Sequence, residues 1–226
     1  MKSLKNKLFL ILVGIIAMGS MTSCLNDDDD NSAIDPQTYK SYLTAMSGRY
    51  TGKARLFTFK GVGSYQTSVK YDSLATSWTQ STDSTITVST IPVNKLDSVI
   101  NINLQSIDDQ SKQIFEALEK SNQMLEIKAF YYIPSSDYVA TDYVSFVVNP
   151  GYPSVKLNIG GKDKYVFFGF YNSAYAGTYL STKGQVQIPM VIGEVRIGDT
   201  NDVRQASAIN SLYVRPIGIT LEGTKF

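Results

Sequence analysis

The sequence has no histidine and only one cysteine, Cys24. Without histidine the chain cannot form a Ser-His-Asp triad, a histidine zinc site or an imidazole acid–base catalyst. A single cysteine excludes an intramolecular disulfide and a cluster of thiolate metal ligands. Catalysis would therefore depend on carboxylates, lysine, tyrosine or serine, which leaves carboxylate-pair glycosidases and Ser-Lys hydrolases open.

A long apolar run and an excess of one charge are also missing. Lysine and arginine number 21 against 20 acidic residues, so we expect no nucleic-acid partner, which would require a dense basic face. The apolar run at residues 8–18 has about eleven residues, whereas a bilayer span needs ~20. No phosphate-binding glycine motif and no Gly-x-Ser-x-Gly elbow is present, so we expect no cofactor.

The first thirty residues have the pattern of an export signal. Lys2, Lys5 and Lys7 precede the apolar run, residues 21–24 read Met-Thr-Ser-Cys, and four aspartates occupy 27–30. This pattern resembles the signal peptide and lipobox of bacterial lipoproteins, with Met21 where leucine is commoner. The acidic run is similar to the surface-export signal of Bacteroidetes lipoproteins.

The resemblance implies cleavage before Cys24, acylation of its sulfur and amine with palmitate-type chains, and delivery to the outer membrane with exposure at the cell surface. A signal peptide without lipid and a transmembrane anchor are the alternatives. The expected organisation is a signal peptide over 1–23, an acidic lipid-anchored tether over 24–34 and one β-rich domain over 35–226.

The rest of the chain predicts a mainly β protein. Short stretches of alternating apolar and polar residues, separated by turn sequences, follow one another with few helices between them. About ten to twelve strands are expected: 49–59, 65–71, 74–78, 85–88, 100–104, 124–133, 138–148, 154–159, 164–170, 175–180, 185–197 and 209–221. Pro189 is expected at an edge or bulge of its strand.

Two helices are clear in the pattern. Asp35-Pro36 suits an N-cap followed by the first helical position, and Gly48 ends that helix. A second helix is predicted over about 107–121, where Ser106 with Asp109 makes a capping arrangement. Consecutive strands favour antiparallel pairing, so the predicted fold is an antiparallel β-sandwich or a flattened barrel with two or three short helices. Gly48-Arg49-Tyr50 is similar to the Gly-x-Trp opening of calycin-like barrels, with Tyr50 in place of tryptophan.

Tyrosine is abundant, with fifteen residues, all of them after Cys24. Tyrosine joins an apolar ring to a hydrogen-bonding tip, which suits binding surfaces for glycans or proteins. Tyr171, Tyr175 and Tyr179 lie close together among small polar residues, so we select them as candidate ligand-binding residues. The alternative is that they are ordinary strand residues with solvated tips.

Two groups of acidic residues are candidates for a catalytic or a cation-binding site. Glu194 with Asp142 or Asp163 could form a glycosidase pair if the carboxyls lay ~5–9 Å apart, and the alternative is a solvated strand face. The sequence Asp199-Thr200-Asn201-Asp202 could hold a cation, and the alternative is a polar turn. No catalytic residue and no metal ligand is selected from either group.

These observations predict a lipid-anchored cell-envelope protein that acts as a ligand- or glycan-binding accessory module rather than an enzyme. Its expected partners are the membrane, through the lipid, and a glycan, small-molecule or protein ligand. A carboxylate-dependent glycan hydrolase and a structural subunit of a surface assembly are the alternatives. A hydrolase requires converging acids, a small-molecule binder requires an interior pocket, and a structural subunit requires an exposed apolar face.

Overall fold

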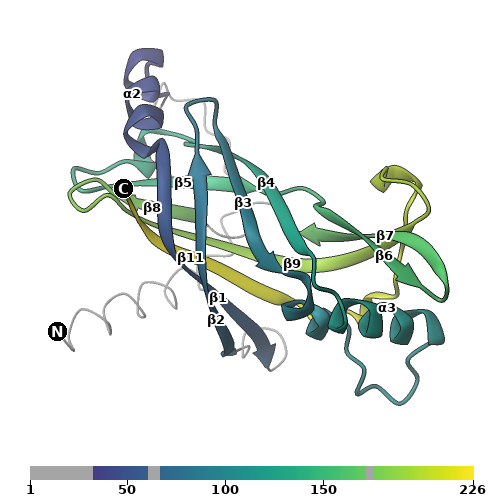
Figure 1. The fold of residues 1–226 in the computed structure, drawn as a ribbon. Coiled ribbons are helices and arrows are strands. Elements are labelled where there is room, and N and C mark those ends of the chain that lie inside the picture. The colour runs from purple at the N-terminus through teal and green to yellow at the C-terminus, as the bar shows by residue number, and fades with distance from the viewer. Residues whose placement is uncertain (1–32, 61–66, 172–175) are drawn as a thin grey trace, which may run out of the picture. The chain divides into compact units, whose positions relative to one another are not determined.

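The computed structural model describes residues 33–60, 67–171 and 176–226 (Figure 1). Cys24, the acidic run and Tyr175 lie outside these ranges, so lipid attachment remains a sequence prediction. Within the ranges, no helix combines the length and the hydropathy that crossing a membrane requires.

The described chain is mainly β, as predicted from the alternation. The strands are β1 (Gly48–Lys60), β2 (Thr67–Gln80), β3 (Thr85–Pro92), β4 (Met124–Tyr132), β5 (Tyr143–Asn149), β6 (Ser154–Ile159), β7 (Lys162–Phe170), β8 (Ala176–Leu180), β9 (Gln185–Gly198), β10 (Ser207–Ala208) and β11 (Ile217–Lys225). The two α-helices are α2 (Pro36–Met46) and α3 (Asp109–Glu119), and short 3₁₀ turns occupy Val93–Lys95, Asp97–Val99, Ser136–Tyr138, Val203–Gln205 and Ser211–Tyr213.

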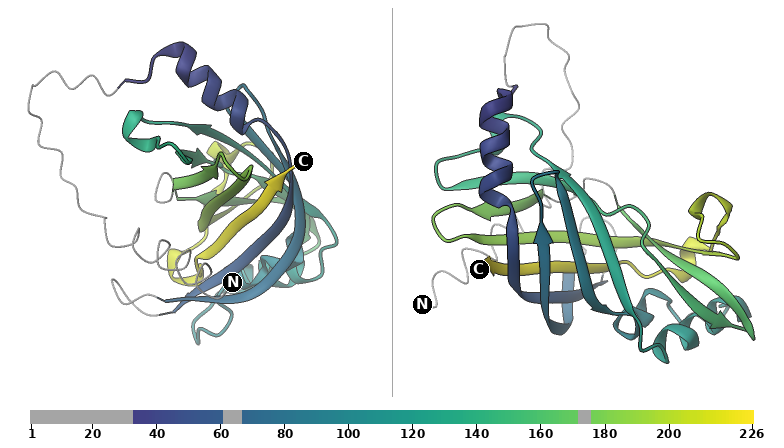
Figure 2. Two further views of the ribbon diagram at one scale, coloured as in Figure 1. Left: turned by 90° about the vertical axis from the view of Figure 1, so that its left-hand side faces the viewer. Right: turned by 45° about the horizontal axis from the view of Figure 1, so that its top comes forward.

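Eight strands close into an antiparallel barrel. They pair in the order β1, β2, β3, β4, β5, β8, β9 and β11, and β11 pairs with β1 to complete the ring. The strands wrap around a common interior (Figure 2). The hairpin of β6 and β7 is inserted between β5 and β8 and lies outside this ring. The structure therefore selects the barrel rather than the sandwich, and the arrangement fits a calycin-like barrel.

Large side chains fill the barrel interior. Alternate residues of each strand point inward, as in β4, where Leu125, Ile127, Ala129 and Tyr131 are buried and their neighbours are exposed. The Tyr50 ring stacks on Trp78 with centroids 5.5 Å apart. The Trp78 indole N–H has no hydrogen-bond partner among the described residues. Over the residues that the structure describes, the interior is therefore a packed core.

Helix α2 begins where the sequence predicts. The Asp35 side chain accepts hydrogen bonds from the backbone N–H groups of Gln37 and Thr38 at 3.0 and 3.1 Å. The fully buried Tyr50 donates its hydroxyl to the carbonyl of Met46 at 2.6 Å. This bond ties the end of α2 to the first strand of the barrel.

Several local predictions were wrong. The strands predicted at 138–148 and 209–221 begin only at Tyr143 and Ile217, after 3₁₀ turns. The cap of α3 is Asp108 rather than Ser106, because the Asp108 carboxylate accepts from the Ser111 N–H at 2.7 Å. The predicted strand at 100–104 is a turn, with one isolated bridge between Ile100 and Val214. Its alternation misled the prediction because five residues without a continuous partner strand do not make a ladder.

Strand β9 belongs to the barrel in its first half and to an extension of the sheet in its second. Gln185–Ile192 pairs with β11, and from Ile192 onward β9 pairs with β7, with Gly193 as a bulge. Strand β6 pairs with the far side of β7 and lies against α3 (Figure 1). Pro189 lies between the last β8 pair of β9 and its first β7 pair, which agrees with the edge expected for proline.

Candidate functional site: a tyrosine platform on the sheet extension

The outer face of the extension carries the most distinctive group of exposed side chains. One side of β7 and β9 packs into the core, and alternation places Glu194 and Arg196 on the opposite side. Tyr152 reaches this face from the segment before β6, and Tyr171 reaches it from the end of β7. We call Tyr152, Tyr171, Glu194 and Arg196 the tyrosine platform.

Two glycines let the tyrosine rings lie directly against the sheet. A Cβ atom at Gly193 would overlap the Tyr171 ring, and a Cβ at Gly169 would lie 2.6 Å from Cε1 of Tyr152. Only glycine leaves room for a ring directly over the backbone at these positions. The rings nevertheless remain accessible, since Tyr171 is 52% exposed and Tyr152 is 41% exposed.

The charged pair of the platform is held by the aromatic ring beside it. Arg196 Nε donates to Glu194 Oε1 and the Tyr152 hydroxyl donates to Glu194 Oε2, both at 2.7 Å. The Arg196 guanidinium carbon lies 5.4 Å from the centre of the Tyr152 ring, within the range of a cation–π contact. The hydrogen bond to Glu194 raises the pKa of Tyr152, and burial adds to the same effect. These contacts hold Tyr152, Glu194 and Arg196 in a defined arrangement.

Glu194 does not meet a second carboxylate. Glu194 pairs with Gly169, and Asp163 lies six residues along β7 from that glycine, a distance of ~20 Å. Asp142 immediately precedes β5, and the pairing of β5 with β8 and of β8 with β9 places this end of β5 in line with Gln185. Gln185 is nine residues from Glu194, or ~30 Å along β9. The glycosidase pairs considered from the sequence are not brought together.

The polar loop after β9 is internally bonded. Asp199 pairs with Lys164, Asn201 Oδ1 accepts from the Ser154 hydroxyl at 2.7 Å, and Asp202 receives two bonds from the Arg204 side chain. Lys164 lowers the pKa of Asp199, chiefly by hydrogen bonding. Over the described ranges, no group of three or more acidic, histidine or cysteine residues is placed to hold a metal. The loop has the bonding of a stabilised turn.

The three tyrosines selected from the sequence do not form one site. Tyr171 belongs to the platform, whereas Tyr179 is 5% exposed and points into the barrel from β8. Tyr175 lies outside the described residues. Sequence reasoning missed Tyr152 and Arg196, although the alternation of 194 and 196 and the strand glycines were available signals.

A second concave region lies at the α2 end of the barrel. A cavity of about 310 Å³ is lined by Ala33, Ile34, Asp35, Thr38, Tyr42, Ser136 and Val139. The one ionisable acid in this lining is Asp35, and its carboxylate already caps α2. The cavity therefore has fewer polar and aromatic side chains available to bind a ligand than the platform has.

Comparison with known proteins identifies the extent of the domain but not its activity. A family model described as "Domain of unknown function (DUF4840)" matches residues 45–197. That range contains the whole tyrosine platform. No curated protein and no solved structure matches the chain.

Proposed function

The chain belongs to this family of unknown function, and from its side-chain geometry we propose that it is a glycan-binding module of the cell envelope. The observation that carries the proposal is a pair of exposed tyrosine rings, each lying directly against a glycine, beside a bonded Glu194–Arg196 pair. A sugar ring has an apolar C–H face and a rim of hydroxyls. The tyrosines offer flat apolar surfaces for the first, and the charged pair offers partners for the second.

The charged pair suits hydroxyl recognition. A sugar hydroxyl can donate to the Glu194 carboxylate and accept from the Arg196 guanidinium, and hydrogen bonds to charged groups are about twice as strong as neutral ones. Each side chain is already held by the other and by Tyr152, so little side-chain freedom is lost on binding.

The sequence prediction of export supports the same proposal. A protein anchored through Cys24 to the outer membrane and displayed at the cell surface meets glycans of its own envelope or of its surroundings. The platform supplies recognition, and the lipid keeps the module at the membrane. Nothing in this proposal requires a reaction, which agrees with the separation of Glu194 from the other candidate carboxylates.

A binding measurement with matched variants tests the proposal. Purified protein is screened against a glycan panel, and the best ligand is then titrated against Tyr171→Ala and Tyr143→Ala. Tyr143 is 41% exposed on β5, away from the platform, and so controls for loss of a surface tyrosine. We expect at least tenfold weaker binding for Tyr171→Ala and no change for Tyr143→Ala. Equal affinity of both variants, or no glycan binding at all, would contradict the proposal.

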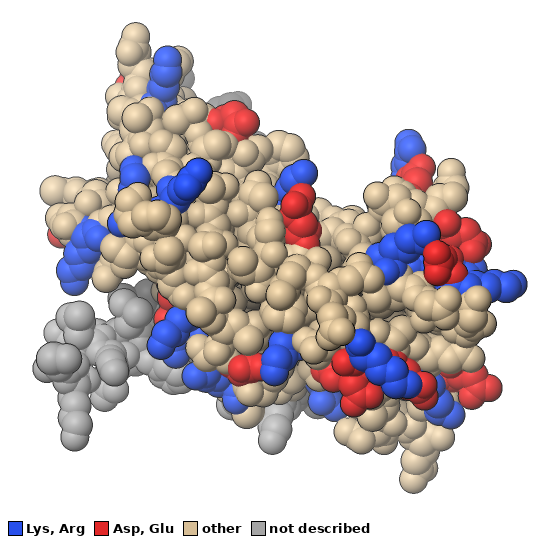
Figure 3. All heavy atoms as spheres, in the orientation of Figure 1, with Lys and Arg blue, Asp and Glu red and all other residues tan. Residues whose placement is uncertain are grey.

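One observation favours a second function, a subunit of a surface assembly. The outer face of β4 exposes Phe130 at 68% and Tyr132 at 48%, two positions apart on the same face of the strand. Large apolar side chains exposed together are typical of protein contact surfaces. The central strands also present a largely uncharged surface, while charged side chains gather over α3 and the β6–β7 end (Figure 3). Loss of assembly in Phe130→Ser, with glycan binding retained, would support this function.

A further inference from the structure

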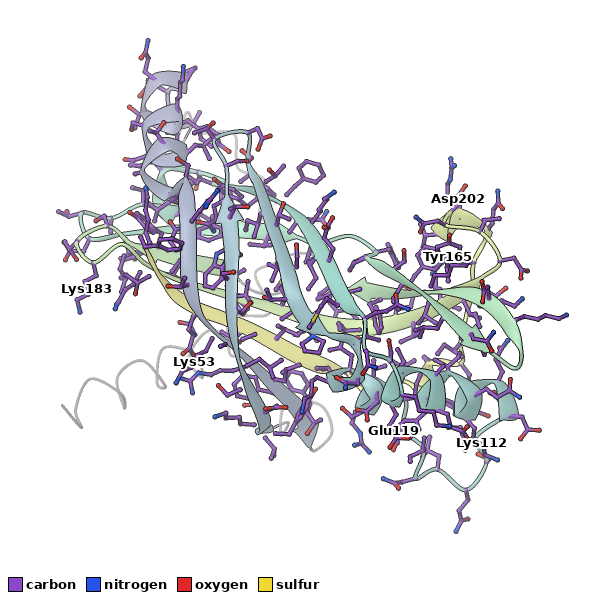
Figure 4. The ribbon with its side chains drawn as sticks, in the orientation of Figure 1. Lys53, Lys112, Glu119, Tyr165, Lys183 and Asp202 are labelled. Atoms are coloured by element: carbon purple, nitrogen blue, oxygen red, sulfur yellow. The ribbon has the colours of Figure 1, made fainter. Side chains whose placement is uncertain are left out.

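The tyrosine platform continues along β7 beyond Tyr152. Side chains of alternate residues share one face, so Tyr165 and Phe167 lie on the same side as Gly169 and Tyr171. The rings of Tyr165 and Phe167 are 6.4 Å apart. Six residues separate Tyr165 from Tyr171, which corresponds to ~20 Å along the strand. Figure 4 marks Tyr165 on this part of the sheet.

Polar groups alternate with the aromatic rings along this line. The strand register places Ser154 of β6, Phe167 of β7 and Arg196 of β9 side by side in one row. The next row contains Lys156, opposite Tyr165. Phe167 is only 2% exposed, so the accessible rings along this line are Tyr171, Tyr152 and Tyr165, with hydrogen-bonding groups between them.

The charges along the same face cancel. Arg196 pairs with Glu194, and Lys156 pairs with Asp163 at 2.8 Å. Both cations thus have an anionic partner. A polyanionic ligand would gain most from unpaired basic side chains, so this face fits a neutral ligand better than an acidic one.

From these observations we infer that the ligand is a neutral, linear oligosaccharide that lies along β7 from Tyr171 past Tyr152 to Tyr165. A single sugar could stack on only one of these rings, whereas a chain of several units contacts all three. The inference rests on the proposed function and assigns Tyr165 the role of an outer binding position.

A series of chain lengths tests the inference. The full-length protein, purified in detergent, is titrated by calorimetry with cello-, xylo-, malto- and manno-oligosaccharides of one to six units. Affinity for the preferred series is expected to rise at least tenfold from the disaccharide to the hexasaccharide. Tyr165→Ala should remove most of that gain and leave disaccharide affinity unchanged. Tyr165→Phe, which keeps the ring, should retain the gain, and Tyr143→Ala should match the wild type.

The outcomes separate this inference from the proposal beneath it. Affinity that does not depend on length, or equal losses for disaccharide and hexasaccharide in Tyr165→Ala, would overturn the extended ligand while leaving glycan binding intact. Binding only to uronate or sulfated oligosaccharides in a parallel titration would overturn the neutral class. An absence of binding to every sugar tested would overturn both.

Discussion

Two glutamate–arginine pairs on the outer surface of the molecule have nearly the same geometry and different surroundings. Arg55 Nε lies 2.7 Å from Glu222 Oε2, and Arg196 Nε lies 2.7 Å from Glu194 Oε1. All four side chains are about one-third exposed. The ion pair alone therefore does not distinguish the candidate site from an ordinary stretch of barrel wall.

The neighbours make the difference. Arg55 lies between Ser73 on β2 and the buried Thr220 on β11, and neither neighbour supplies an aromatic ring. Arg196 instead lies beside the ring of Tyr152. The Tyr152 hydroxyl also donates a hydrogen bond to the second carboxylate oxygen of Glu194. The comparison indicates that recognition depends on flat aromatic surfaces added to a common polar pair.

The glycines near the two pairs should respond most differently to substitution. In Gly52→Ala the new Cβ would overlap the backbone of Glu222 and Gly223, so β1 and β11 must separate. We expect a loss of about 3 kcal/mol in the free energy of unfolding. Gly193→Ala displaces only the exposed Tyr171 ring, so stability should change little while glycan affinity falls. Denaturant unfolding and calorimetry measure the two effects, and equal destabilisation would remove the distinction.

The two arginines provide the next test. Arg196→Ala should weaken glycan binding about tenfold, which corresponds to ~1.4 kcal/mol, because both the guanidinium and the alignment of Tyr152 are lost. Arg55→Ala should leave binding unchanged. Each variant should lose less than about 1 kcal/mol of stability, since exposed ion pairs contribute little. A comparable loss of affinity in Arg55→Ala would show that the platform is not the binding site.

The buried phenols predict how stability depends on pH. Burial raises the pKa of Tyr50 and Tyr131 well above the usual range. Because the folded-state values are raised, the full stability is present below the ordinary tyrosine pKa of ~10 and is lost as the pH rises above it. Urea unfolding at increasing alkaline pH should show this decline. A constant free energy of unfolding through that range would contradict it.

The smallest expected effect concerns the proton of Tyr152. Glu194→Gln removes the charged acceptor that raises the pKa of Tyr152, so that pKa should fall toward its ordinary value. Glu222→Gln is the matched control and should leave it unchanged. NMR titration of ring-labelled tyrosine measures the shift. An unchanged Tyr152 titration in Glu194→Gln would mean that the hydrogen bond does not persist in solution.

The fold could be predicted from the sequence wherever a local pattern is compatible with only one kind of secondary structure. Asp35-Pro36 can start a helix in one way only, and the strict alternation of β4 defines a half-buried strand. The residues 100–104 alternate as well, but a strand also needs a partner, and only Ile100 finds one. The N-cap of α3 is Asp108 rather than the predicted Ser106. Serine and aspartate are both favourable N-cap residues, so the local sequence did not decide between them.

The site was harder to predict because it depends on distant pairing. Tyr171 is exposed, as a ligand-binding residue must be, but the same loop-like composition also selected Tyr179, which faces the interior. Periodicity places residues on alternate faces and does not say which face is buried. Tyr152 and Glu194 are 42 positions apart, and only the β7–β9 register and the Gly169 seat bring them together.

The inserted hairpin has a consequence for how such proteins can diversify. Strands β5, β8 and β9 close the ring without using β6 or β7 for pairing, yet Tyr152, Gly169 and Tyr171 all come from the segment between β5 and β8. Mutation and selection can therefore rewrite this segment while the pairings that close the barrel stay the same. In related chains we expect ligand preference to vary with the hairpin, on a scaffold that is inherited unchanged.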